Sequence, residues 1–149
     1  MVTIISFLGY TGDYVVVVSK PHMSQLFDLV VYGSTSGAVA TAIQAARLGR
    51  SVALVSPYHH IGGIQINGLG ATDIDNQAEF QNSTTLGGLS LELHQRISKH
   101  YNREERLREV VDKTLKDPDV WRFEAKVAEA VIAEWLAEYP SITIVKVRF

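Results

Sequence analysis

The feature that most constrains this chain is an apolar, strand-like run that passes directly into a glycine turn and then a helix. Residues 27–32 have strand composition, and Gly33 follows them at once. Residues 38–48 then place apolar side chains at helical spacing, with Gly49 in the position of a helix stop. Residues 51–55 return to strand character. Such a unit of about 30 residues predicts a right-handed crossover between two parallel strands.

The turn itself resembles a phosphate cradle. In the G-x-G-x-x-G/A pattern the first glycine turns the chain, the second admits a pyrophosphate, and the third small residue packs helix on strand. Gly33 takes the first role and Ala38 the third, whereas Thr35 replaces the second glycine and offers a hydroxyl donor. We expect the N–H groups of Ser36, Gly37 and Ala38 to be free to bind an anion. A crossover with this turn and no ligand remains an alternative.

The end of the second strand lacks the acid that usually holds a ribose. An acidic residue is expected about 20 residues beyond the glycines, where it accepts hydrogen bonds from ribose hydroxyls. Ser56 occupies that position, and a serine binds a hydroxyl only weakly. Because no carboxylate selects an unphosphorylated ribose, the identity of the nucleotide stays open from these residues.

Composition excludes several classes of protein. Lys and Arg number 14 against 16 Asp and Glu, a net charge of −2, so we expect no nucleic-acid partner. Hydrophobic residues at 46% and charged residues at 20% are typical of one globular domain. The absence of cysteine excludes disulfides, thiolate metal sites and a cysteine nucleophile. No further ligand stands at a suitable spacing from His59 and His60, so we expect no metal site.

Residues 1–22 are expected to be an N-terminal extension of a domain formed by residues 23–149. The apolar runs at 2–8 and 14–18 both fall short of the roughly 20 residues that a membrane span requires. A basic leader and a cleavage site are also missing, so we expect no membrane partner and favour the cytoplasm. The run 15–18 predicts a strand, and the extension is either an ordered edge strand or a loose tail.

Helical periodicity predicts three further helices and a final strand. The helices cover residues 89–101, 102–116 and 123–139. We expect the first to face the core, the second to be mostly solvated, and the third to be well buried. His94 and His100 fall on the first helix, where a solvated or capping role is expected. Residues 142–147 predict a strand that joins the parallel sheet beside the second strand.

Four stretches together resemble a known family. They read YGSTSGAVATAIQAARLG, LVSPYHHIGGIQINGLGATDIDN, LGGLSLELHQRI and VWRFEAKVAEAVIAEWL. These look like the N-terminal part of the FAD-dependent oxidoreductases of the two-dinucleotide-binding flavoprotein group, over roughly residues 27–149. The resemblance implies an α/β fold with a Rossmann-like parallel sheet and flanking helices. It also implies FAD as cofactor and an unknown small organic molecule as substrate.

The same resemblance assigns cofactor-binding roles to particular residues. The turn after the first strand would line the pyrophosphate, residues 60–63 would wrap the phosphates, and residues 67–70 would approach the flavin. Ser56 stands where most relatives carry the ribose-binding glutamate. The expected cofactor-binding set is Gly33, Thr35, Ser36, Gly37, Ala38, Ser56, Pro57, His60, Gly62, Gly63, Asn67, Gly68, Leu69 and Gly70.

Two departures from the family limit what the resemblance implies. The later motif usually reads W-x-F-E-P-H-V-A-E, and here Ala125 and Lys126 replace Pro-His, so no residue inherits a role of that histidine. Full members continue well beyond this length, so we expect the chain to end before the substrate domain, and a second chain is one way to complete the flavin site. We therefore name no catalytic residue. An NAD(P)-binding Rossmann domain and a non-catalytic nucleotide-binding remnant remain alternatives.

Overall fold

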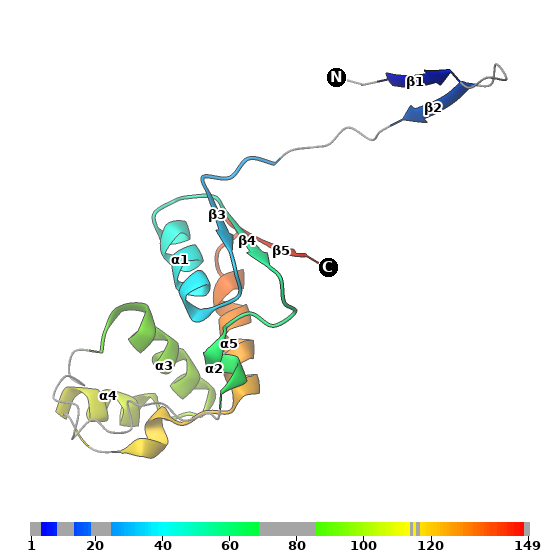
Figure 1. Cartoon of the computed structure of the whole chain (residues 1–149). Coiled ribbons are helices and arrows are strands. Elements are labelled where there is room, and N and C mark those ends of the chain that lie inside the picture. Colours follow the sequence, from blue (N-terminus) through cyan, green and yellow to red (C-terminus); the bar gives the residue numbers. More distant parts are fainter. Residues whose placement is uncertain are drawn as a thin grey trace.

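A parallel three-stranded sheet with helices packed on one face forms the centre of the fold (Figure 1). This computed structural model describes residues 4–8, 14–18, 25–68, 86–113, 115 and 117–147. In chain order the elements are β1 (Ile4–Leu8), β2 (Tyr14–Val18), β3 (Leu29–Tyr32), α1 (Ser36–Arg47), β4 (Val52–Ser56), α2 (Ile64–Asn67), α3 (Gly88–His100), α4 (Glu104–Lys113), the 3-10 helix η3 (Pro118–Trp121), α5 (Ala125–Ala137) and β5 (Ile142–Lys146).

The sheet has the order β3-β4-β5, and both neighbouring pairs are parallel. In register, Val30 of β3 lies beside Ala53 of β4, which in turn lies beside Thr143 of β5. The predicted crossover from β3 through α1 to β4 is confirmed, as is the final strand beside the second one. The fold class is therefore the expected α/β, Rossmann-like arrangement.

One face of the sheet is buried by α1 and α5, and on the other face the edge strand β3 is exposed in the described part of the chain. Leu29 and Val31 of β3 share the covered face with Val52 and Leu54 of β4, because side chains alternate along a strand. On α5 the predicted apolar stripe is confirmed, since its members are all buried: Val127, Ala128, Val131, Ile132, Trp135 and Leu136. On the opposite face, the side chains of the edge strand β3 are exposed, Val30 at 61% and Tyr32 at 65%.

The helices α3 and α4 lie side by side beyond the sheet and enclose a second, smaller core with η3 (Figure 1). Its buried members are Leu107, Val110, Val120 and Trp121. The second predicted helix is shorter than expected. Asn102 has a φ of +54°, a left-handed conformation that ends α3, so α4 begins only at Glu104.

His94 corrects a prediction about the first of these helices. Its ring is only 3% exposed and contacts the rings of Trp121 and Phe123 edge-on, with centroids 5.2 and 5.9 Å away. His94 is therefore not solvated, and burial lowers its pKa to about 4. His100, in the last turn of the same helix, is exposed as expected.

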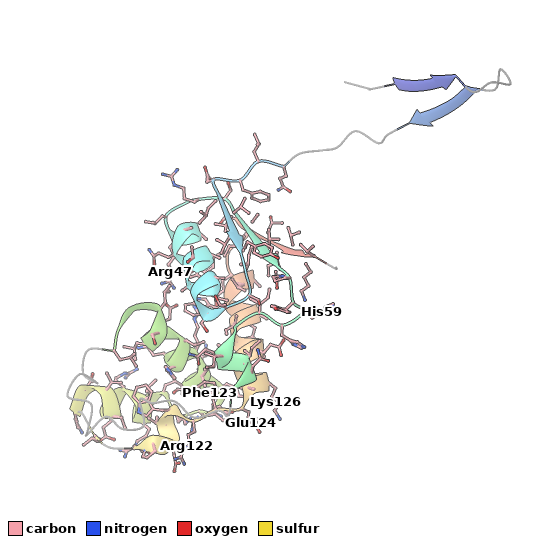
Figure 2. All side chains as sticks on the ribbon, in the orientation of Figure 1. Arg47, His59, Arg122, Phe123, Glu124 and Lys126 are labelled. Atoms are coloured by element: carbon pink, nitrogen blue, oxygen red, sulfur yellow. The ribbon has the colours of Figure 1, made fainter. Side chains whose placement is uncertain are left out.

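A chain of ion pairs ties α1, α3 and α5 together. Arg47 of α1 donates from Nη2 to both carboxylate oxygens of Glu92 at 2.7 Å (Figure 2 labels Arg47). Arg96 donates to Glu92 and to Glu138, and its guanidinium lies 4.7 Å from the centre of the Trp135 ring. These contacts join helices that are far apart in sequence.

The N-terminal strands β1 and β2 pair with each other in an antiparallel, two-stranded sheet. The strand predicted at residues 15–18 is confirmed, and in the described residues its partner is β1 and not the parallel sheet. The boundary between residues 22 and 23 stays a prediction. None of the helices in the described ranges is long and apolar enough to cross a membrane.

Candidate functional site

The turn after β3 depends on Gly33. Its φ is +141°, a conformation that residues with a side chain rarely adopt, and its N–H donates to Val55 O at 2.9 Å. A Cβ at this position would meet nothing closer than Ala38 Cβ at 3.9 Å. The requirement for glycine therefore comes from the backbone conformation and not from a lack of space.

Thr35, in place of the second glycine of the motif, is the N-cap of α1. Its Oγ1 accepts a hydrogen bond from Ala38 N–H at 3.2 Å. The expectation that Ala38 N–H is free is therefore wrong. The signal was present in the sequence, because threonine is a favoured N-cap residue directly before a helix. Since Oγ1 acts here as an acceptor, its own hydrogen stays available to a ligand.

The N–H groups of Ser36 and Gly37 have no protein acceptor among the residues that the structure describes. They open a helix of 12 residues, whose aligned peptide dipoles favour an anion at this end. Gly37 is exposed, and a Cβ there would make only an ordinary contact, 3.7 Å from Thr35 Oγ1. The turn therefore presents two free donors and a backbone that a phosphate can approach closely.

The segment after β4 is fixed directly against this turn. Gly62 N–H donates to Ser34 O, and Gly62 O accepts from the Ser36 hydroxyl, both at 2.8 Å. Gly63 lies closer still, because a Cβ on it would fall 2.9 Å from Thr35 Cα, and its φ is +61°. The structure thus brings together two of the predicted segments, the turn and the His60–Gly63 stretch.

Ser56 lies at the predicted position, but its side chain faces inward. It is fully buried on the same face of the sheet as Leu54, and its hydroxyl donates to Tyr58 O at 2.6 Å and accepts from Tyr58 N–H at 3.2 Å. Pro57 follows it and is half-buried. The Ser56 hydroxyl is therefore occupied by the chain's own backbone, and its proposed contact with a ribose stays a prediction.

The stretch expected to approach the flavin is described only in part. Residues 64–67 form the short helix α2, which the glycine pattern did not predict. Asn67 ends this helix, and its Nδ2 donates to Gly63 O at 2.9 Å, while Gly68 is exposed. The predicted residues Leu69 and Gly70 lie outside the described residues.

The loop after β4 also reaches α5 through a contact that the sequence did not predict. His60 Nδ1 lies 2.6 Å from Oε1 of Glu129. His59 is exposed on the same loop (Figure 2). In the described part of the chain, no group of three histidine, aspartate, glutamate or cysteine side chains is placed to hold a metal ion.

The altered motif before α5 leaves a charged pair at the start of this helix. Lys126 Nζ lies 3.3 Å from Glu124 Oε2, and both side chains are exposed (Figure 2). Lys126 is a cation that cannot accept a hydrogen bond, unlike the histidine usual at this position. Lys126 therefore cannot replace that histidine as a hydrogen-bond acceptor.

A pocket of about 270 Å³ opens beside the N-terminus of α1. Ser36 and Gly37 form its polar end, Gln65 of α2 stands at another side, and Leu93 and Trp135 contribute apolar walls. A mostly apolar pocket with a few convergent polar groups is the usual form of a cofactor or ligand site.

Comparison with protein families identifies the chain. A family model described as FAD dependent oxidoreductase matches residues 28–147, from just before β3 to just after β5. The chain belongs to this family. The resemblance inferred from the four sequence stretches is confirmed, and FAD is the cofactor of this FAD-binding oxidoreductase family. A comparison with curated proteins finds no match.

The residues of this FAD dependent oxidoreductase fit the phosphate part of the cofactor better than its ribose. The free N–H groups of Ser36 and Gly37, with no side chain on Gly37, suit a pyrophosphate. No carboxylate stands at Ser56 to accept hydrogen bonds from the adenosine ribose, and the serine hydroxyl is already bonded to Tyr58. The roles of the individual residues remain predictions.

Proposed function

We propose that this chain binds FAD with the pyrophosphate on the N-terminus of α1, as the cofactor-binding part of an oxidoreductase for a small organic substrate. The observation that carries this proposal is the pair of unused N–H groups at Ser36 and Gly37. Backbone donors at a helix start are matched to a diphosphate in both direction and charge. Family membership supports FAD as the diphosphate carrier.

The surrounding residues have distinct roles in this proposal. Gly37 keeps the approach to the backbone open, Thr35 donates its free hydroxyl hydrogen to a phosphate oxygen, and residues 60–63 flank the phosphates. When bound, FAD supplies the hydride or electron transfer, whereas the protein contributes binding and orientation. No residue of the described chain is assigned to substrate chemistry.

Gly37→Ala tests the pyrophosphate position without disturbing the fold. The new methyl group meets only an ordinary contact, and alanine favours a helix over glycine by up to about 1 kcal/mol. We expect unchanged or slightly higher stability in urea but an FAD Kd raised by roughly tenfold or more, about 1.4 kcal/mol. Gln44→Ala, an exposed change in the same helix, is the matched control. Equal FAD binding by both variants would remove the phosphate from this turn.

An NAD(P) cofactor is the second candidate, and Ser56 is the observation that favours it. With no carboxylate at the end of β4, nothing there rejects the 2′-phosphate of NADPH. Competition titrations with FAD, NADH and NADPH on the purified chain distinguish the two cofactors. Flavin absorbance retained after desalting supports FAD, whereas tight NADPH binding with no retained flavin favours the second candidate.

We further propose that turnover requires a second polypeptide surface over the flavin ring. Hydride transfer needs water excluded and the substrate held in line, and the turn and strand ends described above contact only the phosphate side in our proposal. We expect FAD-loaded protein to be photoreduced anaerobically but to show little reduction by small hydroxylated substrates. Robust substrate-dependent flavin reduction by this chain alone would contradict the requirement.

A further inference from the structure

His60 and Glu129 join the loop after β4 to helix α5. The distance between Nδ1 and Oε1 is 2.6 Å, although 69 positions separate the residues. Their side chains are 66% and 40% exposed. A polar contact with this exposure adds little to folding stability, because water competes for the hydrogen bond and both side chains lose conformational freedom. Any larger effect of the pair must come from what His60 holds in place.

His60 begins the segment that is fixed to the glycine turn. Two positions later, Gly62 exchanges hydrogen bonds with Ser34 and Ser36. Ile61, between the two points, is buried in the main core. The segment is therefore held at one end by the turn and at the other end by α5, and Glu129 supplies the second attachment.

The contact also determines how the imidazole is presented. An ionised carboxylate only accepts hydrogen bonds, so the hydrogen in this contact is on Nδ1 of His60. A carboxylate bonded to one ring nitrogen fixes both the tautomer and the orientation of a histidine. Nε2 is then the ring nitrogen that a bound molecule can reach.

We propose that Glu129 is a positioning residue for FAD, which acts through His60 on the segment flanking the pyrophosphate. The inference rests on the proposed function. Without the carboxylate, the imidazole can rotate and the segment loses its polar contact with α5, although Ile61 stays packed in the core. Bound FAD then has to order the His60 side chain and its neighbours itself. The FAD Kd therefore rises, whereas the free energy of unfolding of the FAD-free protein does not change.

A double-mutant cycle on the full chain tests this role. We expect Glu129→Ala to raise the FAD Kd by about tenfold, the upper end of the cost of ordering one further side chain on binding. Urea unfolding of the FAD-free protein should not change. Glu129→Gln keeps an acceptor oxygen and should recover most of the affinity. In a His60→Ala background, Glu129→Ala should cause no further loss. Glu134→Ala removes another exposed glutamate of α5 and is the matched control.

The possible outcomes separate this inference from the proposed function. Equal Kd values for Glu129→Ala and Glu134→Ala would overturn the role of Glu129 and leave FAD binding intact. An equal loss of affinity with and without His60 would do the same, because Glu129 would then act independently. If the unaltered chain does not bind FAD, both the proposed function and the inference are overturned.

The contact itself has a readout that needs no cofactor. The ¹⁵N chemical shifts of the His60 ring in the FAD-free chain should report a hydrogen on Nδ1, and Glu129→Ala should abolish that preference. A His60 ring with its hydrogen mainly on Nε2 in the unaltered chain would contradict the positioning role.

Discussion

Polar side chains have different surroundings in two regions of the molecule. One region is built around the sheet, and the other is formed by α3, α4 and η3. In the first, side chains near the turns bond to nearby backbone, as Thr35 and Ser56 do, and the unused donors of Ser36 and Gly37 are on the surface. The second encloses His94 and buries Ser98 Oγ and Trp121 Nε1 without a partner among the described residues, as the first also does with Trp135 Nε1 of α5. The exposed donors of the sheet part are the ones that we propose bind a ligand, whereas in the helical part the buried His94 makes the stability depend on pH.

The largest expected effect falls on the glycine turn of the sheet part. Gly33→Val should abolish FAD retention, because a β-branched residue at φ +141° costs about 1–3 kcal/mol, and relieving that strain moves the turn that presents the N–H groups of Ser36 and Gly37. Flavin absorbance after desalting measures the loss. Gly49→Ala also places a side chain at a positive φ, but at the far end of α1, so it should lower stability and leave the FAD Kd unchanged. Normal titration of Gly33→Val with FAD would refute the assignment.

The next largest effect is a loss of folding stability at low pH, and it comes from His94 in the helical part. Burial lowers the pKa of His94 to about 4, from 6.5 in the unfolded chain, so the unfolded chain binds more protons between these values. Stability from this site is complete above pH 6.5 and declines as the pH falls, by about 3 kcal/mol at pH 4.

Urea unfolding between pH 7 and pH 4 measures the dependence. His94→Phe keeps an aromatic ring among Trp121 and Phe123 and should flatten the pH dependence. His100→Gln, an exposed change on the same helix, should leave the dependence as it is. A slope that persists in His94→Phe would assign the acid sensitivity to other groups.

Within the sheet part, we expect a smaller effect at Ser56, on stability and not on FAD binding. Ser56→Ala removes the hydroxyl bonded to Tyr58 in a fully buried position, so we expect a loss of about 1 to 2 kcal/mol in stability. The FAD Kd should stay within about twofold, because the hydroxyl does not face outward. Isothermal titration beside urea unfolding separates the two effects. The opposite result, weaker FAD binding at unchanged stability, would place Ser56 at the ribose.

The smallest effect on stability is expected at Glu92, whose ion pairs join α3 to α1. Glu92→Gln weakens the ion pairs with Arg47 and Arg96, which lie near the surface, so we expect a stability loss below about 1 kcal/mol. The loss should shrink at high salt, because salt screens the original ion pairs. Urea unfolding at low and high salt tests this expectation. A loss that is large and independent of salt would mean that Glu92 contributes through packing.

Local patterns in the sequence were sufficient to predict the sheet part. The strand, glycine turn, helix and second strand are specified by neighbouring residues, and the apolar stripe of α5 by helical spacing. Thr35 as an N-cap was equally predictable from its type and place.

The remaining features depend on tertiary contacts. Which face of α3 meets η3 decides that His94 is buried, although the sequence predicted correctly that this helix faces the core. His60 and Glu129 meet only after α5 has packed beside the β4 loop, and no local pattern encodes a pairing over 69 positions. The helix α2 has only four residues and no side-chain cap, so its sequence carries little helical signal.

The exposed side chains of β3 affect how the purified protein behaves at high concentration. Val30 and Tyr32 are exposed on β3, which is an edge strand in the described residues, so apolar side chains lie beside unpaired backbone donors and acceptors. Such an edge is a template for adding a strand from another molecule and favours aggregation. Self-association should therefore increase with protein concentration, and Val30→Lys should improve colloidal solubility without reaching the turn where the cofactor is proposed to bind.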